Sequence, residues 1–495
     1  MGLSLDGLIR ALSPQWGLRR ELARRTYEAI QSTPQRRPKG NNSSANAALY
    51  PAGDKLRAYA RHLDENHDLA IGILDTLVNN IVGTGITVEP MVARKNGALV
   101  EKLNDQIRTL WDAWADRPEV TRTYALPSVE RLACRSWLRD GEVLAQLVNG
   151  RRADLAHTTE VPFSIEMLEA DFLPTDYVDE KKGIWHGVQM DAWGAPRIYW
   201  LHKQHPGDKS SFAISTAANL KTIKAEDAIH LKFARRFHQV RGVSIFHGVL
   251  GRLDDIKMYE ESELIAARVA AAFTAFIKKS ADLAGATTNA AGNRSFEMSP
   301  GFVFDNLLPG EDVGMISSDR PNTNLAAFVG DQMRRVASGT GTSASSISKR
   351  YDGTYSAQRQ EMVEVAPNYK VMRDYFIAHF MQPIYRRFID MAVMSGQINV
   401  PAGVDAYKCA WFGVGQPWID PEKETKADAL AVESRFKSRH QIIRERGGDP
   451  RQVDEQLKRE REQDKANGVE PIVKKPEAPA EEPADANETD SEAAA

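Results

Sequence analysis

Apolar residues recur at helical spacing in the first part of the chain. Between residues 55 and 82, large apolar side chains follow one another mostly in steps of three or four, which predicts an amphipathic helix. The stretch Gly-Thr-Gly-Ile-Thr-Val-Glu-Pro (83–90) indicates that the helix ends and a strand begins. Gly83 is expected to end the helix with a positive φ. The pattern consists of Leu56, Tyr59, Leu63, Ile71, Leu74 and Leu77.

Between about residues 140 and 232 the pattern changes to short runs typical of β-strands. Residues 142–148 precede the pair Asn149-Gly150, which predicts a hairpin. Apolar and polar positions alternate in 184–190 and 196–203, on either side of a turn at 191–195. Residues 225–233 predict another strand. This part of the chain is therefore expected to form a sheet.

After residue 242 the pattern is helical again. Residues 244–280 are rich in alanine, with apolar side chains roughly on one face. Residues 280–295 have the composition of a loop or insertion, and 301–313 indicate a strand and a turn. The longest helical pattern runs from Val365 to Met391, and we expect a bend or a break near Pro367 and near Pro383, which lie inside it. Together these patterns predict an α+β protein.

The two ends of the chain differ in charge. Residues 1–40 carry eight Lys or Arg against three acidic residues, and 37–47 have the composition of a linker. The last twenty residues carry seven acids, no base and three prolines, so we expect a disordered acidic tail. At 495 residues the chain is long enough for two to four domains.

Overall charge and cysteine content exclude several classes of protein. The net charge of −3 lacks the basic excess typical of tight nucleic-acid binding, so any contact with DNA is expected to be loose. Two cysteines, Cys134 and Cys409, are too few for a disulfide framework or a thiolate zinc site, and we expect buried thiols. The sequence has no run of about 18 apolar residues, so no membrane span is expected.

The glycine-rich segment 338–349 invites comparison with phosphate-binding loops. The nucleotide-binding loop needs Gly-Lys followed by Ser or Thr, so that backbone N–H groups and the lysine meet the phosphates together. Here Gly341 is followed by Thr342 and Ser343. We therefore predict no nucleotide site.

Other candidate chemistry is equally incomplete. Glu169 and Asp171 could bind a divalent ion, but acids also occupy the solvent face of a hairpin. His202 and His205 have no third ligand nearby in the sequence, and His230 has the pattern of a partly buried strand histidine. The chain lacks G-x-S-x-G, and neither cysteine lies in a recognisable active-site sequence. We assign no catalytic, cofactor-binding or metal-binding residues.

Several phrases, taken in order, resemble the lambda-like branch of the portal proteins of tailed bacteriophages. One departure is Ala357, which stands where the family pattern Tyr-Ser-Ser-x-Arg has its second serine. Each phrase alone is weak, but their order and spacing are specific to that family. The phrases are residues 56–86, 139–147 (RDGEVLAQL), 165–173 (IEMLEADFL), 187–201, 228–244, 307–313, 355–360 (YSAQRQ) and 418–449.

The resemblance implies a structural role and no enzyme activity. Portal proteins form a ring, usually of twelve subunits, at one vertex of the capsid of the virion, after assembly in the host cytoplasm. Terminase drives double-stranded DNA through the ring, and the DNA later leaves by the same route. Further implied partners are the terminase large subunit, the major capsid and scaffolding proteins, and head-tail connector proteins.

The resemblance also implies a portal-type fold with an α/β wing, a helical stem, a small clip and a C-terminal helical crown. The expected divisions are 1–50 (basic arm and linker), 51–242 (wing), 243–320 (stem and clip), 321–419 (channel loop and kinked wing helix), 420–468 (crown) and 469–495 (disordered acidic tail).

A DNA channel suits the charge of this chain. Twelve subunits at −3 each carry −36, and near-neutral or acidic walls let a duplex slide because they add little binding energy at each step. We expect residues 338–358 to be a polar loop near the channel, joining a helix at 322–338 to the long helix after 360. Lys349 and Arg350 would contact phosphates without sequence specificity. The alternative is a loop packed between neighbouring subunits.

Two other classes of function remain open at this point. A metal-dependent DNA-processing enzyme would depend on Glu169 and Asp171. A scaffold or adaptor protein would not form a ring.

Overall fold

The computed structural model describes residues 42–208, 219–272, 276–279, 311–314, 324–415 and 421–468, together with Ser13, Gln15, Trp16 and Gly40. Side chains are described in these ranges except at 269–279 and 311–314. Nearly all of the predicted basic arm, the insertion at 280–295 and the acidic tail lie outside the described residues.

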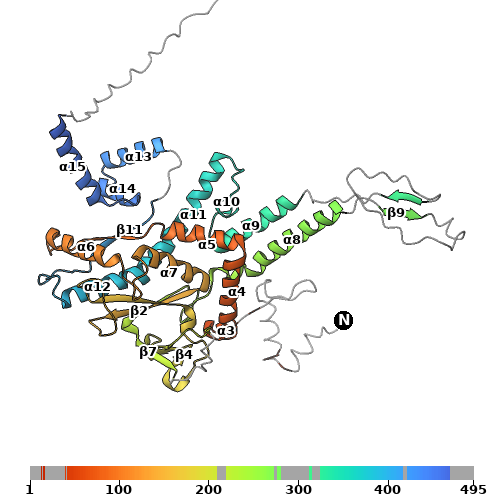
Figure 1. Ribbon diagram of the computed structural model, residues 1–495, viewed down its shortest axis with the longest axis horizontal. Helices are drawn as coiled ribbons and strands as arrows, with labels where there is room; N and C mark the ends of the chain where they lie inside the picture. Colours follow the sequence, from red (N-terminus) through yellow and green to blue (C-terminus); the bar gives the residue numbers. More distant parts are fainter. Residues whose placement is uncertain are drawn as a thin grey trace, which may run out of the picture.

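A three-stranded antiparallel sheet, in the order β3-β2-β8, lies at the centre of the body (Figure 1). Strand β2 pairs antiparallel with the next strand, β3, from Leu144–Leu168 to Asn149–Phe163, but the tight turn predicted at Asn149-Gly150 is wrong, because residues 150–162 connect the two strands. The strands are β2 (Glu142–Asn149), β3 (Phe163–Leu168) and β8 (Ala228–Lys232).

A second, four-stranded antiparallel sheet covers one face of the first. Leu144 and Leu168 of the central sheet pack with Val188, Tyr199 and Leu201 of the second sheet in one apolar cluster. Neighbouring positions of β2, such as Val143 and Ala145, point to the opposite face and join the main core. Strand β2 is apolar on both faces because both are buried. The second sheet contains β4 (Ile184–Trp185), β5 (Val188–Met190), β6 (Pro196–His202) and β7 (Leu220–Lys224).

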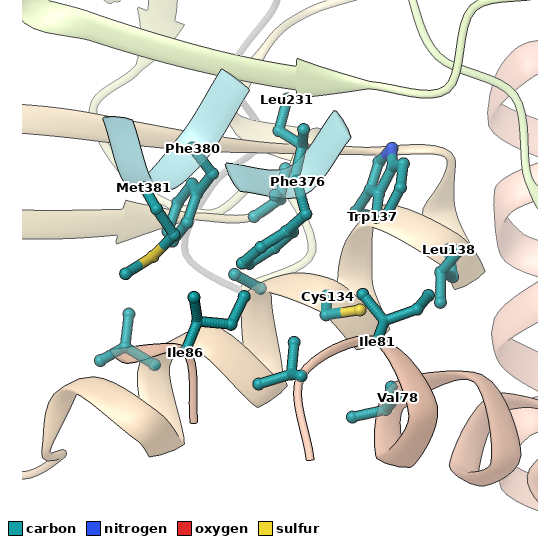
Figure 2. Packing of buried hydrophobic residues seen from close by; sticks show 14 of the residues in the cluster. Val78, Ile81, Ile86, Cys134, Trp137, Leu138, Leu231, Phe376, Phe380 and Met381 are labelled. Atoms are coloured by element: carbon teal, nitrogen blue, oxygen red, sulfur yellow. The ribbon is translucent and has the colours of Figure 1, made fainter. Parts of the chain in front are cut away.

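Helices cover the other face of the central sheet and form the main core. Figure 2 shows Trp137 and Cys134 on one helix facing Phe376, Phe380 and Met381 from a segment far along the chain. These side chains are almost completely buried. The helices of this layer are α5 (Asp68–Ile81), α6 (Glu101–Ala115), α7 (Leu126–Asp140), α11 (Tyr355–Phe376) and α12 (Gln382–Met394).

The helix predicted over 55–82 is in fact two helices, α4 (Gly53–Asn66) and α5. The chain is extended at His67, between the two helices, where φ is −126° and ψ is 111°. The imidazole of His67 is buried, with its Nε2 2.9 Å from the carbonyl oxygen of Leu253. Gly83 has a φ of 62°, as predicted. A short helix, α3 (Ala45–Leu49), precedes α4.

The long helix predicted from 365 onward is interrupted once. Residues Ile377–Met381 form a π-helical segment directly before Pro383, which lies in the first turn of α12. An interruption near Pro383 is therefore confirmed. Helix α11 continues through Pro367, so a break there was a wrong expectation.

Strand β11 (Cys409–Phe412) was not predicted. It pairs antiparallel with β1 (Thr87–Pro90), the strand expected after Gly83, and this pairing brings the two halves of the chain together. Helices follow near the C-terminus: α13 (Pro421–Glu433), α14 (Arg439–Glu445) and α15 (Pro450–Asn467).

A helical hairpin projects from the body (Figure 1). Helix α8 (Leu250–Ala272) runs outward and α9 (Leu325–Thr340) returns alongside it. Tyr259 of α8 meets Phe328 of α9 edge-on, with ring centroids 5.1 Å apart. Toward the far end of this pair, β9 (Phe276–Lys279) pairs with β10 (Glu311–Gly314), so the helical pattern expected over 244–280 is wrong at its end. We call α8 and α9 the projecting hairpin.

Candidate functional site

The segment between α9 and α11 holds the two predicted DNA-contacting residues. The expected polar loop is partly helical, since Ala344–Ser348 form α10, and α11 begins at Tyr355 rather than after 360. Side-chain oxygens cap the N-termini of both helices. The hydroxyl of Ser343 accepts a hydrogen bond from the N–H of Ser346, and the hydroxyl of Thr354 accepts one from the N–H of Ala357. The loop expectation is therefore corrected, because its serine and threonine residues cap helices.

Glu361 of α11 holds this segment in place. Its carboxylate accepts hydrogen bonds from Ser343 Oγ (2.8 Å), Ser345 Oγ (2.5 Å) and the Ser345 N–H (3.2 Å). Burial acts to raise its pKa, but the hydrogen bonds from Ser345 and Ser343 outweigh it and lower the pKa. Asn368 Nδ2 also donates to the carbonyl of Gly341, at 2.7 Å. Glu361 could not be predicted as a partner of these serines, because no spacing rule joins a residue to others 16 and 18 positions earlier.

Lys349 and Arg350 lie at the exposed end of the segment. Lys349 has a φ of 54°, an uncommon conformation for a residue other than glycine, and ends α10. It forms no ion pair with any residue that the structure describes. Arg350 pairs with Asp352, and both side chains are more than 60% exposed. The structure thus presents two neighbouring cations to solvent on a segment fixed by Glu361.

Glu169 and Asp171 lie beside His205 in the structure. One ligand atom from each lies within 4.8 Å of the others, although both acids are more than 30 positions from His205 in the sequence. The His205 Nε2 lies 3.3 Å from a carboxylate oxygen of Glu169. Asp171 belongs to a 3₁₀ turn after β3 (Ala170–Phe172), which aims it back toward α4.

Two arginines of α4 already neutralise these carboxylates. Arg61 Nη2 lies 2.5 Å from Asp171 Oδ2 and 3.6 Å from Glu169 Oε2, and Arg57 Nε lies 3.3 Å from Asp171 Oδ1. Although burial acts to raise the pKa of Asp171, Arg57 and Arg61 lower it. A guanidinium bridging both acids disfavours a divalent cation there by charge repulsion. The cluster therefore fits an ion-pair network better than a metal centre.

A buried ion network lies at the end of the central sheet. Glu142 accepts from Arg241 Nε (2.6 Å), from the Gly242 N–H (2.7 Å) and from His230 Nε2 (2.9 Å), and it is almost completely buried. Burial raises the pKa of Glu142, but Arg241 and His230 together hold it well below its usual range. Burial lowers the pKa of His230 despite the neighbouring carboxylate. His230 is a partly buried strand histidine, as expected, and donates a hydrogen bond to the Glu142 carboxylate.

This network explains two of the phrases on which the resemblance depends. In residues 139–147, Gly141 has a φ of 89°, and a Cβ on it would lie 2.3 Å from the backbone of Val243. In residues 228–244, a Cβ on Gly242 would lie 1.9 Å from the carbonyl oxygen of Gly141. The two segments are in close backbone contact where Glu142 meets Arg241. The residues of these two phrases therefore have a structural role, because they hold the two segments together.

The two cysteines differ in how far they are buried. Burial raises the pKa of the thiols of Cys134 and Cys409, of which Cys134 is buried and Cys409 only partly. Among the described residues, no helix is long and apolar enough to cross a membrane.

Comparison with known proteins agrees with the resemblance. The family described as phage portal protein, lambda family, matches residues 32–373. The probable portal protein of Halomonas phage phiHAP-1 is 25% identical over 438 residues, which cover 85% of this chain and 82% of that protein. Portal protein B of Escherichia phage lambda is 20% identical over 311 residues, 57% of this chain and 55% of that protein.

Among solved structures, a chain from the virion of a native gene transfer agent particle aligns over 83% of this chain and 97% of its own length. Its sequence identity is 12% and its TM-score 0.42.

The family match, which covers more than half of the chain, defines the class as phage portal proteins. Within that class, the chain belongs to the lambda family of phage portal proteins.

Proposed function

We propose that this portal protein closes into a ring, of about twelve subunits, through which double-stranded DNA enters and leaves the particle. The observation that carries the proposal is the family match over residues 32–373, which spans most of the body, the projecting hairpin and the segment with Lys349 and Arg350. The wall of such a channel should bind DNA phosphates only weakly. The exposed Lys349 and Arg350, on a chain of net charge −3, are consistent with weak binding.

In this proposal the parts of the chain take the roles that the family implies. The sheets and the helices that cover them form the wing, the projecting hairpin forms the stem, and β9 with β10 belongs to the clip. Helices α13 to α15 form the crown. The ring sits at the portal vertex of the virion after assembly in the host cytoplasm, where it contacts the terminase large subunit, capsid and scaffolding proteins, and later head-tail connectors.

The alternative of a metal-dependent DNA-processing enzyme is disfavoured, because the carboxylates on which it would depend, Glu169 and Asp171, are bridged by Arg61.

The proposal is tested by asking whether particles need this chain to acquire DNA. Capsids assembled with the protein and supplied with terminase, ATP and linear DNA should protect that DNA from added nuclease. Capsids assembled without it should protect none. Equal protection in both preparations would contradict the proposed function.

A further inference from the structure

A cavity of about 590 Å³ lies between the second sheet, the segment that follows β8 and the start of α3. Its apolar lining includes Trp185 of β4, Val188 and Met190 of β5, and Val240. Strand β4 and α3 lie together at one end of the body (Figure 1). Ligand-binding cavities in proteins have volumes of about 300–1,000 Å³, so this one is large enough to receive a partner group.

One wall of the cavity, formed by residues 233–240, has a fixed shape although it lies outside the sheets. Lys232 Nζ donates to the carbonyl oxygens of Gln239, at 2.7 Å, and Val240, at 3.1 Å. From the other side, Asn46 Oδ1 accepts a hydrogen bond from the Val240 N–H at 2.9 Å. The wall is therefore preformed, which lowers the entropic cost of binding a partner.

Two aromatic rings at the rim of the cavity are almost uncovered. Phe237 is 98% exposed and Trp193, in the turn 191–195, is 91% exposed. The turn lies beside the wall, because a Cβ on Gly194 would be 3.7 Å from Nδ1 of His238. Exposed aromatic side chains around a concave apolar surface are typical of the residues that contribute most to protein–protein contacts.

The charged residues that line the cavity, Lys232 and Arg236, are both cations, and the described lining contains no Asp or Glu. Arg236 Nη1 donates to the carbonyl oxygen of Ser43 at 2.9 Å, and Arg236 forms no ion pair with any residue that the structure describes. Burial lowers the pKa of Lys232 despite the attraction of Glu142. An incoming carboxylate would stabilise both cations.

Neither end of this chain has a composition that matches the cavity. Residues 1–40 carry eight bases against three acids, so charge repulsion opposes their binding beside Arg236. The last twenty residues are acidic but contain no aromatic or large aliphatic side chain to fill an apolar cavity. Duplex DNA needs many phosphate contacts, and two cations beside an apolar hollow offer few. The matching occupant is a segment of another protein.

We propose that the cavity binds an acidic segment of another protein of the particle, which inserts an aromatic or large aliphatic side chain beside Trp185 and Phe237. Carboxylates of that segment pair with Arg236. Lys349 and Arg350 are not among the residues that line this site. The inference therefore goes beyond the proposed passage of DNA through the ring.

Photo-cross-linking in cells that assemble particles tests this site. The full chain carries p-benzoylphenylalanine in place of Phe237, a position so exposed that the change should leave the fold intact. After irradiation, mass spectrometry should identify a linked protein segment with an excess of Asp and Glu and at least one large apolar residue. The matched control carries the same photoreactive residue in place of Tyr124, an exposed aromatic near Arg122 and outside the cavity, and should not link to that segment.

A synthetic peptide with the sequence of the linked segment supplies the second measurement. Fluorescence anisotropy with the purified full-length protein should show binding about tenfold weaker or more for Arg236→Gln, because a charge-assisted hydrogen bond is lost. Phe237→Ala should weaken it similarly, whereas Arg122→Gln and Tyr124→Ala should leave it unchanged.

Four results would overturn the inference: no adduct at Phe237, the same adduct at Tyr124, an adduct with nucleic acid, a basic segment or either end of this chain, and peptide binding that survives both changes in the cavity. The proposed passage of DNA does not depend on this cavity and would stand in each case.

Discussion

Replacing Arg241 by leucine should destabilise the body severely. The change leaves Glu142 charged, buried and without its main partner, a situation that costs about 3–5 kcal/mol. The midpoint of thermal unfolding should fall by about 10 °C or more, because one kcal/mol corresponds to a few degrees in a domain of this size. Circular dichroism at increasing temperature measures this directly.

The matched control is Arg350→Leu, which removes an exposed arginine from its pair with Asp352. Exposed ion pairs contribute about 0–1 kcal/mol, so this variant should unfold close to the unmodified protein. Equal midpoints for the Arg241 and Arg350 variants would show that the buried network does not stabilise the fold.

The same network makes the stability of the folded protein depend on pH. Because the pKa of Glu142 is lowered in the folded protein, its stabilisation is complete above its unfolded value of about 4.3 and is lost as the pH falls below it. The deficit of the Arg241→Leu variant should therefore be large at pH 7 and shrink in acid. A deficit that grows in acid would contradict this assignment.

The double variant Lys349→Glu with Arg350→Glu should assemble normally but package little DNA. Each subunit changes by four charges at an exposed segment, and in a ring this places a band of acids where the duplex must pass. We expect the amount of nuclease-protected DNA to fall about tenfold or more at low salt, with a smaller deficit at higher salt because screening weakens the repulsion.

The control changes the same charges elsewhere. Lys181→Glu with Lys182→Glu alters two adjacent exposed lysines on a 3₁₀ turn of the body, Glu180–Lys182. It should package normally. Normal packaging by the Lys349 and Arg350 variant would remove these residues from any role with DNA, and intact rings in electron micrographs exclude misassembly as the cause of a loss.

Local signals in the sequence predicted much of the secondary structure because periodicity and turn residues act over a few positions. Strand β2 and the turn at 191–195 follow from such signals, as does the positive φ of Gly83. The break at His67 was missed because the apolar spacing continues on both sides of it, whereas its extended backbone and its contact with Leu253 are seen only in the structure.

Contacts between distant segments could not be predicted in the same way. Strand β11 is four residues long and takes its partner from more than 300 positions earlier. Arg61 reaches Glu169 and Asp171 only after α4 packs beside the central sheet, so the two acids resembled a metal site when considered alone. The role of Lys349 and Arg350 was proposed from the sequence and stays a prediction, whereas Glu361, which accepts hydrogen bonds from Ser343 and Ser345 earlier in the same segment, could be identified only in the structure.

The mass of the purified protein in solution tests the central claim most directly. At 55.1 kDa per chain, a ring of twelve has a mass of about 660 kDa. Mass photometry should show a species near this value, and negative-stain microscopy of the same sample should show rings with a central hole. A protein that stays at 55.1 kDa under all buffer conditions would contradict the account.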